Sequence, residues 1–152
     1  MKLAEALIIR ADLQKRIGQL KVRLKDSSKV QEGDTPAEDI QDLYKELDCS
    51  LEQLEDLIYR INVTNMQTIH EGETLTRMMA RKDVLSTRLN VMRELVAHVT
   101  DAETRYARNE IKYVRTVNVA ELRRTTDNFS KQLRELDTKI QSLNWTTDLV
   151  EL

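Results

Sequence analysis

The sequence predicts a mainly α-helical protein, namely an antiparallel four-helix bundle of long, coiled-coil-like helices with a short extended segment near residues 111–117. The 152 residues include only three glycines and one proline, too few for the many turns of a β-sandwich or a doubly wound sheet. A third of the residues are charged and 4% are aromatic, a balance typical of long helices packed through aliphatic stripes. We expect one domain spanning residues 1–152.

The first helix is predicted from about Leu3 to Leu24. Arg10 falls where an apolar residue is expected, and its stem can pack while its head reaches solvent or a glutamate. A polar loop from Ser27 to Asp34 follows. The apolar stripe of this helix consists of Leu3, Leu7, Leu13, Ile17, Leu20 and Leu24.

The second helix is the longest element that the sequence predicts. Thr35 can cap it, Pro36 suits its first position, and Glu38 completes a capping box. Running to Asn65, it would be roughly 45 Å long, and it therefore needs partners of similar length. Asn65 falls on the apolar stripe, where it either fixes the register of packing or caps the helix end. The stripe consists of Leu43, Leu47, Leu51, Leu54, Ile58 and Ile61.

The third helix follows a connection from Met66 to Thr74, with a turn at Glu71-Gly72. Thr74 or Thr76 can cap it, and it is expected to end near residues 105–109. Lys82 and Glu103 interrupt its apolar stripe. The stripe consists of Leu75, Met78, Leu85, Leu89, Met92, Val96, Val99 and Tyr106.

The segment from Glu110 to Val117 does not have a helical pattern. Five of its eight residues are β-branched or aromatic, which favours an extended strand. A lone strand needs a partner. The candidates are Lys29–Gln31 in the same chain and the same strand of a second subunit, which would give a two-fold dimer.

The fourth helix is predicted from an Asn118 cap, with Glu121 in the capping-box position, to about Leu143. Trp145, the one tryptophan, is expected to plug the end of the bundle rather than bind a ligand. The apolar stripe consists of Leu122, Thr126, Phe129, Leu133, Leu136, Ile140 and Leu143.

Charge is distributed unevenly along the chain. Seven Lys/Arg stand against two Asp/Glu in residues 1–25, two against eleven in residues 26–58, and eleven against six in residues 75–124. We interpret this as an acidic second helix lying between basic neighbours. No nucleic-acid partner is expected, because the basic residues are not grouped with aromatic ones and the chain is not basic overall.

No catalytic, cofactor or metal site is expected, and we do not expect an enzyme. A di-metal bundle needs Glu-x-x-His pairs, yet Gln67 and Leu95 stand three residues before His70 and His98. Cys49 is the one cysteine, which excludes an internal disulfide and predicts a cytoplasmic protein. No apolar run of about eighteen residues predicts a membrane span.

Polar residues at the two ends of the predicted bundle are the candidate interface residues, together with Trp145. The group around the extended segment could bind an anion, form an interface, or pair with acids of the Ser27–Asp34 loop and its neighbour Glu38. The candidates at the end of the second helix are Arg60, Asn62 and Asn65. Those around the extended segment are Arg105, Tyr106, Arg108, Lys112, Tyr113 and Arg115.

Several stretches resemble the septicolysin-like family of small bacterial proteins. The similar stretches, spread over nearly the whole chain, are residues 2–14, Lys29–Gly33, Arg60–Asn62 with Thr64–Asn65, Thr74–Thr76, Glu110–Val114 and Asn144–Thr147. None of them is a catalytic signature. The family name implies a pore-forming cytolysin, and the resemblance carries no established site residues.

The preferred hypothesis is therefore a cytoplasmic helical-bundle protein that acts by self-association, as a dimer or higher homo-oligomer, or by binding a protein partner. The alternative is a septicolysin-like, membrane-active protein, and its candidate for membrane contact is the basic first helix with Leu7-Ile8-Ile9. A third hypothesis is an enzyme or small-ligand binder at the Arg105–Arg115 end.

Overall fold

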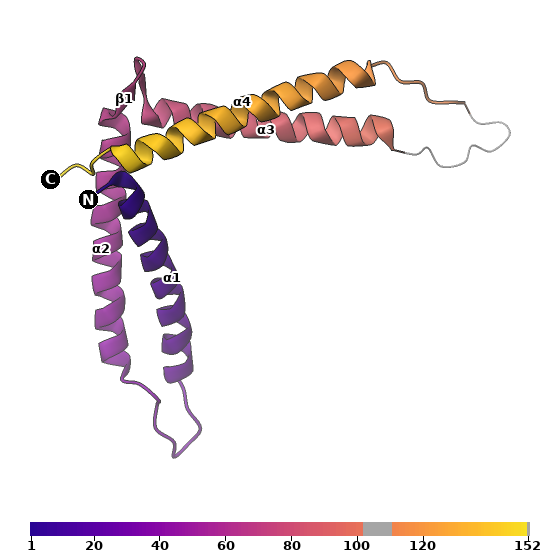
Figure 1. Cartoon of the computed structure of the whole chain (residues 1–152). Helices are drawn as coiled ribbons and strands as arrows, with labels where there is room; N and C mark the ends of the chain where they lie inside the picture. The colour runs from indigo at the N-terminus through magenta and orange to yellow at the C-terminus, as the bar shows by residue number, and fades with distance from the viewer. Residues whose placement is uncertain (102–110, 152) are drawn as a thin grey trace. The chain divides into compact units, whose positions relative to one another are not determined.

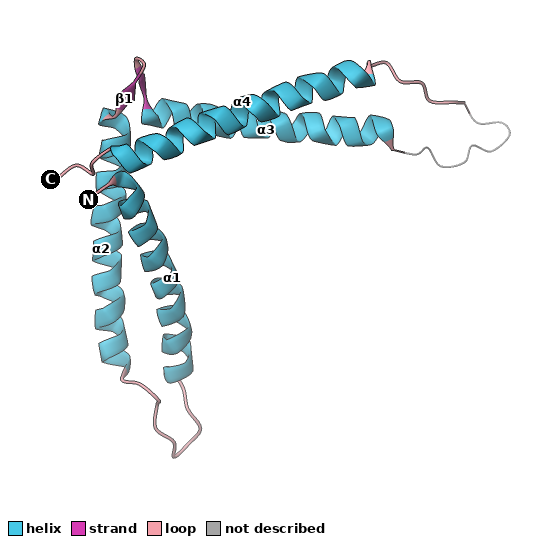
Figure 2. Ribbon diagram, in the orientation of Figure 1, coloured by secondary structure: helices cyan, strands magenta, loops and turns pink. Residues whose placement is uncertain are grey.

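The computed structural model describes residues 1–101 and 111–151 and confirms a mainly helical fold. The four helices are α1 (Leu3–Ser27), α2 (Ile40–Gln67), α3 (Leu75–Thr100) and α4 (Val119–Thr146). Two short strands, β1 (Ile69–His70) and β2 (Glu73–Thr74), join α2 to α3 (Figures 1 and 2). The chain forms two compact units, one of Met1–Thr76 with Gln141–Leu152 and the other of Arg77–Ile140.

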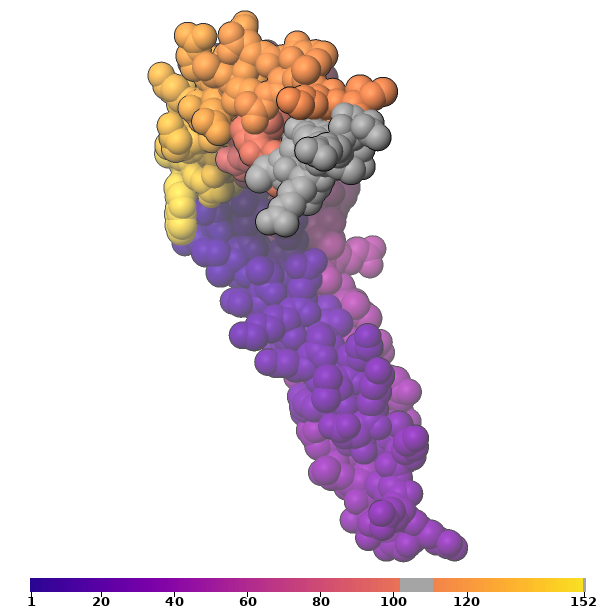
Figure 3. All heavy atoms as spheres, turned by 90° about the vertical axis from the view of Figure 1, so that its right-hand side faces the viewer, coloured from indigo at the N-terminus to yellow at the C-terminus, as the bar shows by residue number. Residues whose placement is uncertain are grey.

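In the first unit, α1 and α2 pack as an antiparallel pair, and in the side view of Figure 3 α1 lies in front of α2. Their inner positions alternate at spacings of three and four, the seven-residue repeat of a coiled coil. Those of α1 are Leu3, Ala6, Arg10, Leu13, Ile17, Leu20, Leu24 and Ser27. Those of α2 are Leu43, Leu47, Ser50, Leu54, Leu57, Ile61 and Thr64.

The predicted α2 stripe was wrong at two positions. Leu51 and Ile58 are exposed, while Ser50 and Leu57 are buried in their place. The helix keeps a strict seven-residue period, so the inner face passes through the small Ser50 rather than the larger Leu51. The Ser50 hydroxyl donates to the Glu46 carbonyl at 2.8 Å, which removes the cost of burying it.

Ion pairs along one flank of the pair join basic α1 to acidic α2, as the charge pattern predicted. Arg16 Nη2 lies 2.8 Å from Glu46 Oε1. Arg23 reaches Glu38 through two guanidinium nitrogens and Glu46 at 3.4 Å. These side chains are partly exposed, so the network fixes the register of the two helices more than it stabilises the fold.

The predicted start of α2 was wrong. Asp39 caps the helix, and its Oδ1 accepts hydrogen bonds from the backbone N–H groups of Gln41 (2.7 Å) and Asp42 (3.2 Å). Thr35 does not take this role, because the helix begins only at Ile40. Arg23 binds the carboxylate of Glu38. The next residue, Asp39, has a short side chain whose carboxylate reaches the first free backbone N–H groups of the helix.

At its other end, α2 continues to Gln67, so Asn65 is a buried residue within the helix and not its cap. The turn at Glu71-Gly72 is confirmed. Both residues have positive φ, 51° and 82°, as a two-residue hairpin turn requires. This turn joins β1 to β2, a hairpin that the sequence did not predict.

In the second unit, α3 and α4 run antiparallel (Figure 1), and residues of both predicted stripes are buried or half-buried, among them Leu89 and Leu133. Lys82, which interrupts the α3 stripe, is half-buried and pairs with Asp137 at 2.5 Å. The Arg88 guanidinium lies 4.9 Å from the centre of the Phe129 ring, within cation–π range. The predicted cap of α4 is confirmed, since Asn118 Oδ1 accepts from the Glu121 N–H at 3.1 Å.

The predicted pairing of residues 111–117 with Lys29–Gln31 in the same chain was wrong, whereas pairing with the same strand of a second subunit stays a prediction. Among the described residues, neither 111–117 nor Lys29–Gln31 is part of a β-strand. Ile111 and Val114 are instead highly exposed. The strand propensity of a residue reflects how well its side chain packs on a pleated sheet. Where no sheet is present, a high propensity does not make the segment a strand. The predicted end of α3 near 105–109 lies outside the described residues.

Neighbouring residues on α2 provide a test of the inner face. Leu57→Ala removes a buried side chain and should lower the free energy of unfolding by about 2–5 kcal/mol. Ile58→Ala, one residue along on the exposed side, should cost about 1 kcal/mol or less. Urea unfolding followed by circular dichroism measures both. A larger loss for Ile58→Ala would contradict the observed register.

Candidate functional site

The two ends of the chain meet in the first unit, in an arrangement that we call the terminal clasp: Met1–Leu3, residues 147–150 and the α2 residues Arg60 and Thr64. The Leu3 N–H donates to the Thr147 carbonyl, and the Leu149 N–H donates to the Met1 carbonyl, each at 2.9 Å. Between these bonds, Lys2 Nζ lies 2.8 Å from Asp148 Oδ1. The clasp is therefore a short backbone pairing reinforced by an ion pair.

The C-terminal end of α2 forms the other side of the terminal clasp. Arg60 Nε donates to the Val150 carbonyl at 3.0 Å, and the Val150 N–H donates to Thr64 Oγ1 at 3.0 Å. The Thr64 hydroxyl in turn donates to the Arg60 carbonyl at 2.8 Å. Arg60, a predicted interface residue, is thus engaged in holding the tail. Asn62 is exposed and Asn65 is buried.

The carboxylates of Asp148 and Glu38 have shifted pKa values, each because of a basic neighbour. The hydrogen bond from Lys2 lowers the pKa of Asp148, and the hydrogen bond from Arg23 lowers the pKa of Glu38. The same bond to Glu38 raises the pKa of Arg23 above its ordinary value. All three groups belong to structural ion pairs, one in the terminal clasp and the others between α1 and α2.

The prediction that Trp145 plugs the end of the bundle was wrong. Its side chain is 56% exposed, while the preceding Asn144 is buried. The helix α4 continues to Thr146, three residues beyond the predicted end, and this places Trp145 on its outer side. Among the described tail residues, Leu149 is a buried apolar residue.

The predicted group around residue 110 is only partly described. Lys112, Tyr113 and Arg115 are exposed and lie in a segment without helix or strand. Arg105, Tyr106 and Arg108 lie outside the described residues. Whether these six residues form an anion site or an interface, or pair with acids of the Ser27–Asp34 loop and Glu38, therefore stays a prediction.

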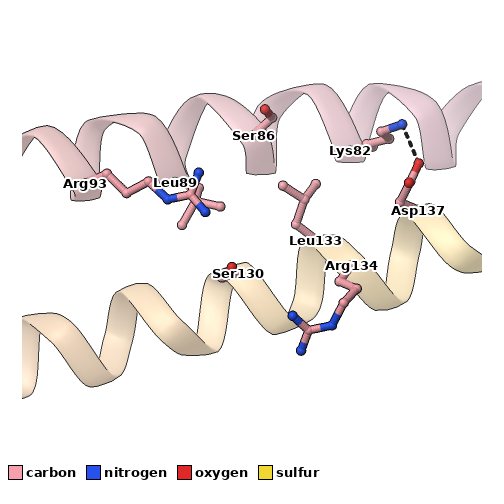
Figure 4. Close-up of a pocket in the computed structure, with 8 residues that line it drawn as sticks. All are labelled: Lys82, Ser86, Leu89, Arg93, Ser130, Leu133, Arg134 and Asp137. Carbon is pink, nitrogen blue, oxygen red and sulfur yellow. Dashed lines mark hydrogen bonds and ion pairs between the residues drawn. The ribbon is translucent and has the colours of Figure 1, made fainter.

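A groove of about 340 Å³ runs between α3 and α4 (Figure 4). Leu89 and Leu133 point between the two helices, and the Lys82–Asp137 ion pair bridges them. The Arg134 head group points away from α3. The lining combines apolar packing with hydroxyl and charged groups: Lys82, Ser86, Leu89, Arg93, Ser130, Leu133, Arg134 and Asp137.

A second row of residues runs along α2, about a quarter turn around the helix from its inner face. We call it the α2 outer stripe. Leu51 is 44% exposed and Ile58 is 38% exposed, and two exposed acids lie between the apolar residues. The stripe has spacings of four and three and consists of Tyr44, Asp48, Leu51, Glu55 and Ile58.

A matching row on α3, the α3 outer stripe, consists of Val84, Arg88, Val91 and Leu95. Val84 is 70% exposed and Val91 is 59% exposed, and Leu95 is also exposed. The charged residue between the apolar residues of this row is the basic Arg88. Sequence reasoning missed this row, although the seven-residue spacing from Val84 to Val91 was a signal that could have found it.

The described residues contain no group of three or more His, Cys, Asp or Glu side chains that could hold a metal ion. None of the helices in residues 1–101 and 111–151 is long and apolar enough to cross a membrane.

The Thr64 hydroxyl is the buried link between α2 and the tail. Thr64→Val keeps the shape of the side chain but leaves the Val150 N–H without its acceptor. We expect a loss of about 1–3 kcal/mol in unfolding free energy and faster hydrogen exchange at Val150. Thr138→Val is the matched control, because Thr138 is exposed and its hydroxyl bonds only within α4. Equal effects of the two substitutions would contradict the linking role.

The chain is similar in sequence and in fold to known proteins. It matches a solved structure described as a functionally unknown conserved protein from Corynebacterium diphtheriae, with 41% identity, a TM-score of 0.91 and coverage of 99% of each chain. No curated protein matches it. Residues 10–149 match the model of a family of unknown function, DUF6847. Because that match covers most of the sequence, the chain belongs to the DUF6847 family of unknown function.

Proposed function

We propose that this protein acts as a helical interaction protein in the cytoplasm, through self-association or through binding of a protein partner. The observation that carries the proposal is the pair of outer stripes. Single exposed apolar residues are normal on a protein surface. In both stripes exposed apolar residues recur seven residues apart on one helix face, with charged residues at positions between them, and a seven-residue period is the repeat by which one helix packs on another.

Each outer stripe has the composition of an interhelical contact. The apolar residues of α2 and α3 repeat with the same seven-residue period as the inner faces of their own pairs. Charged residues stand between them, which is how coiled coils select partners. Helix-on-helix recognition of this kind uses anchors at one face of each helix, and both stripes supply such anchors.

The cytoplasmic location rests on separate support. Cys49 is a free, exposed thiol on α2, and it is the one cysteine of the sequence. A chain with one unpaired thiol suits a reducing compartment.

Self-association has a direct test. We expect sedimentation velocity of the purified protein to show a mass that rises with concentration through the micromolar range, because apolar stripes become buried between chains. A strict monomer throughout that range would exclude self-association, and binding of a different protein would then be the remaining form of this proposal.

A second candidate function is membrane activity, as the septicolysin-like resemblance implies. The observation that favours it is the exposure of the adjacent Ile8 and Ile9 on α1. The helix also carries basic residues, among them the exposed Lys15 and Arg16. Exposed isoleucines beside basic groups are the elements of an interfacial helix on an anionic membrane.

Membrane activity is tested by dye release from liposomes. If this function holds, the protein should release dye from vesicles containing anionic lipid, and Ile8→Ser with Ile9→Ser should reduce the release because apolar anchors are lost. A double variant of Val84→Ser and Val91→Ser, on another helix, serves as the control. No release from either anionic or neutral vesicles would exclude this candidate.

A further inference from the structure

We propose that the partner of this protein is a second copy of the same chain, with the α2 outer stripe of one copy packed against the α3 outer stripe of the other. This inference rests on the proposed function, self-association, and names the two surfaces that form the contact. It is carried by the exposure, period and charge of the two stripes.

The charge of the two units is the first argument. Residues 1–76 and 141–152 contain 17 Asp/Glu and 10 Lys/Arg, a net charge of −7. Residues 77–140 contain 9 Asp/Glu and 14 Lys/Arg, a net charge of +5, and the two together give the −2 of the whole sequence. Unlike units of two copies therefore attract, while like units repel.

The stripes carry the same opposition at the level of single residues. On α2, the acids Asp48 and Glu55 flank Leu51, whereas on α3 the basic Arg88 lies between Val84 and Val91. An α2 stripe against an α2 stripe would bring four carboxylates of two copies together. An α3 stripe against another α3 stripe would bring two Arg88 side chains together. Only the mixed pairing places opposite charges beside the apolar contacts.

The two rows also agree in length and period. From Tyr44 to Ile58 the α2 outer stripe spans about 21 Å, and from Val84 to Leu95 the α3 outer stripe spans about 17 Å, at about 1.5 Å per residue. Both repeat every seven residues, so their apolar side chains can stay in phase along the contact. Both stripes are exposed in the described structure, and their substitution should leave the inner faces intact.

Two double variants test the pairing. The α2 variant carries Leu51→Lys and Ile58→Lys, which opposes positive charge to Arg88 of the other copy. The α3 variant carries Val84→Glu and Val91→Glu, which opposes negative charge to Asp48 and Glu55. We expect each variant alone to sediment as a monomer at concentrations where the unchanged protein associates.

Mixing the variants separates this pairing from any other. The α2 variant keeps an intact α3 stripe and the α3 variant keeps an intact α2 stripe, so an equimolar mixture should restore a one-to-one complex. Ile8→Lys with Val22→Lys, on exposed positions of α1 outside both stripes, should leave association unchanged. Circular dichroism and thermal unfolding establish that each variant is folded.

A measurement on the unchanged protein supports the same test without any substitution. Because opposite charges meet in the contact, the dissociation constant should rise about tenfold between about 0.05 and 0.5 M NaCl. A dissociation constant that stays constant or falls would overturn the mixed pairing.

The outcomes distinguish the two proposals. If the unchanged protein is a monomer throughout the micromolar range, self-association fails and the mixed pairing fails with it. If the unchanged protein associates but one of the double variants keeps the same mass, the mixed pairing is wrong and self-association stands. Monomeric variants whose mixture forms a complex would establish the mixed pairing.

Discussion

The terminal clasp is the constraint on which the first unit depends. Two helices packed face to face bury little apolar surface, so an α1–α2 pair gains from any further element that covers its end. The tail provides this by burying Leu149 and by satisfying polar groups of α2. Thr64 lies at the centre of the arrangement, because it belongs to the inner face of α2 and also binds the tail through its hydroxyl.

The helical class and most of the packing faces could be predicted from the sequence, because the period of apolar residues is a direct consequence of helix geometry. The cap at Asn118 followed from the same local rules. The start of α2 could not be predicted in this way, since Thr35 and Asp39 are both good caps and the Arg23–Glu38 ion pair is a tertiary contact. The burial of Ser50 was not predicted for a similar reason, because its hydroxyl finds a hydrogen-bond acceptor, the Glu46 carbonyl, only within a formed helix.

The candidate site was less predictable than the fold. Arg60 was noticed as a polar residue at a helix end, but its role in holding the tail depends on a partner ninety residues away. The environment of Trp145 was predicted wrongly because it depends on where α4 ends, and this helix includes Trp145. The outer stripes combine exposed apolar residues with opposite charges. Their significance emerges only after the inner faces have been assigned, because the same sequence period describes both.

The terminal clasp has a consequence for the order of folding. Lys2 and Thr146 are 144 residues apart, and closing so long a loop carries a larger entropic cost than forming the turns between neighbouring helices. Contacts within each helix pair join residues that are closer together in the sequence, so these contacts can form early. We therefore expect the clasp to form last, when the docked tail supplies the Thr147 carbonyl that accepts the Leu3 N–H in the first turn of α1.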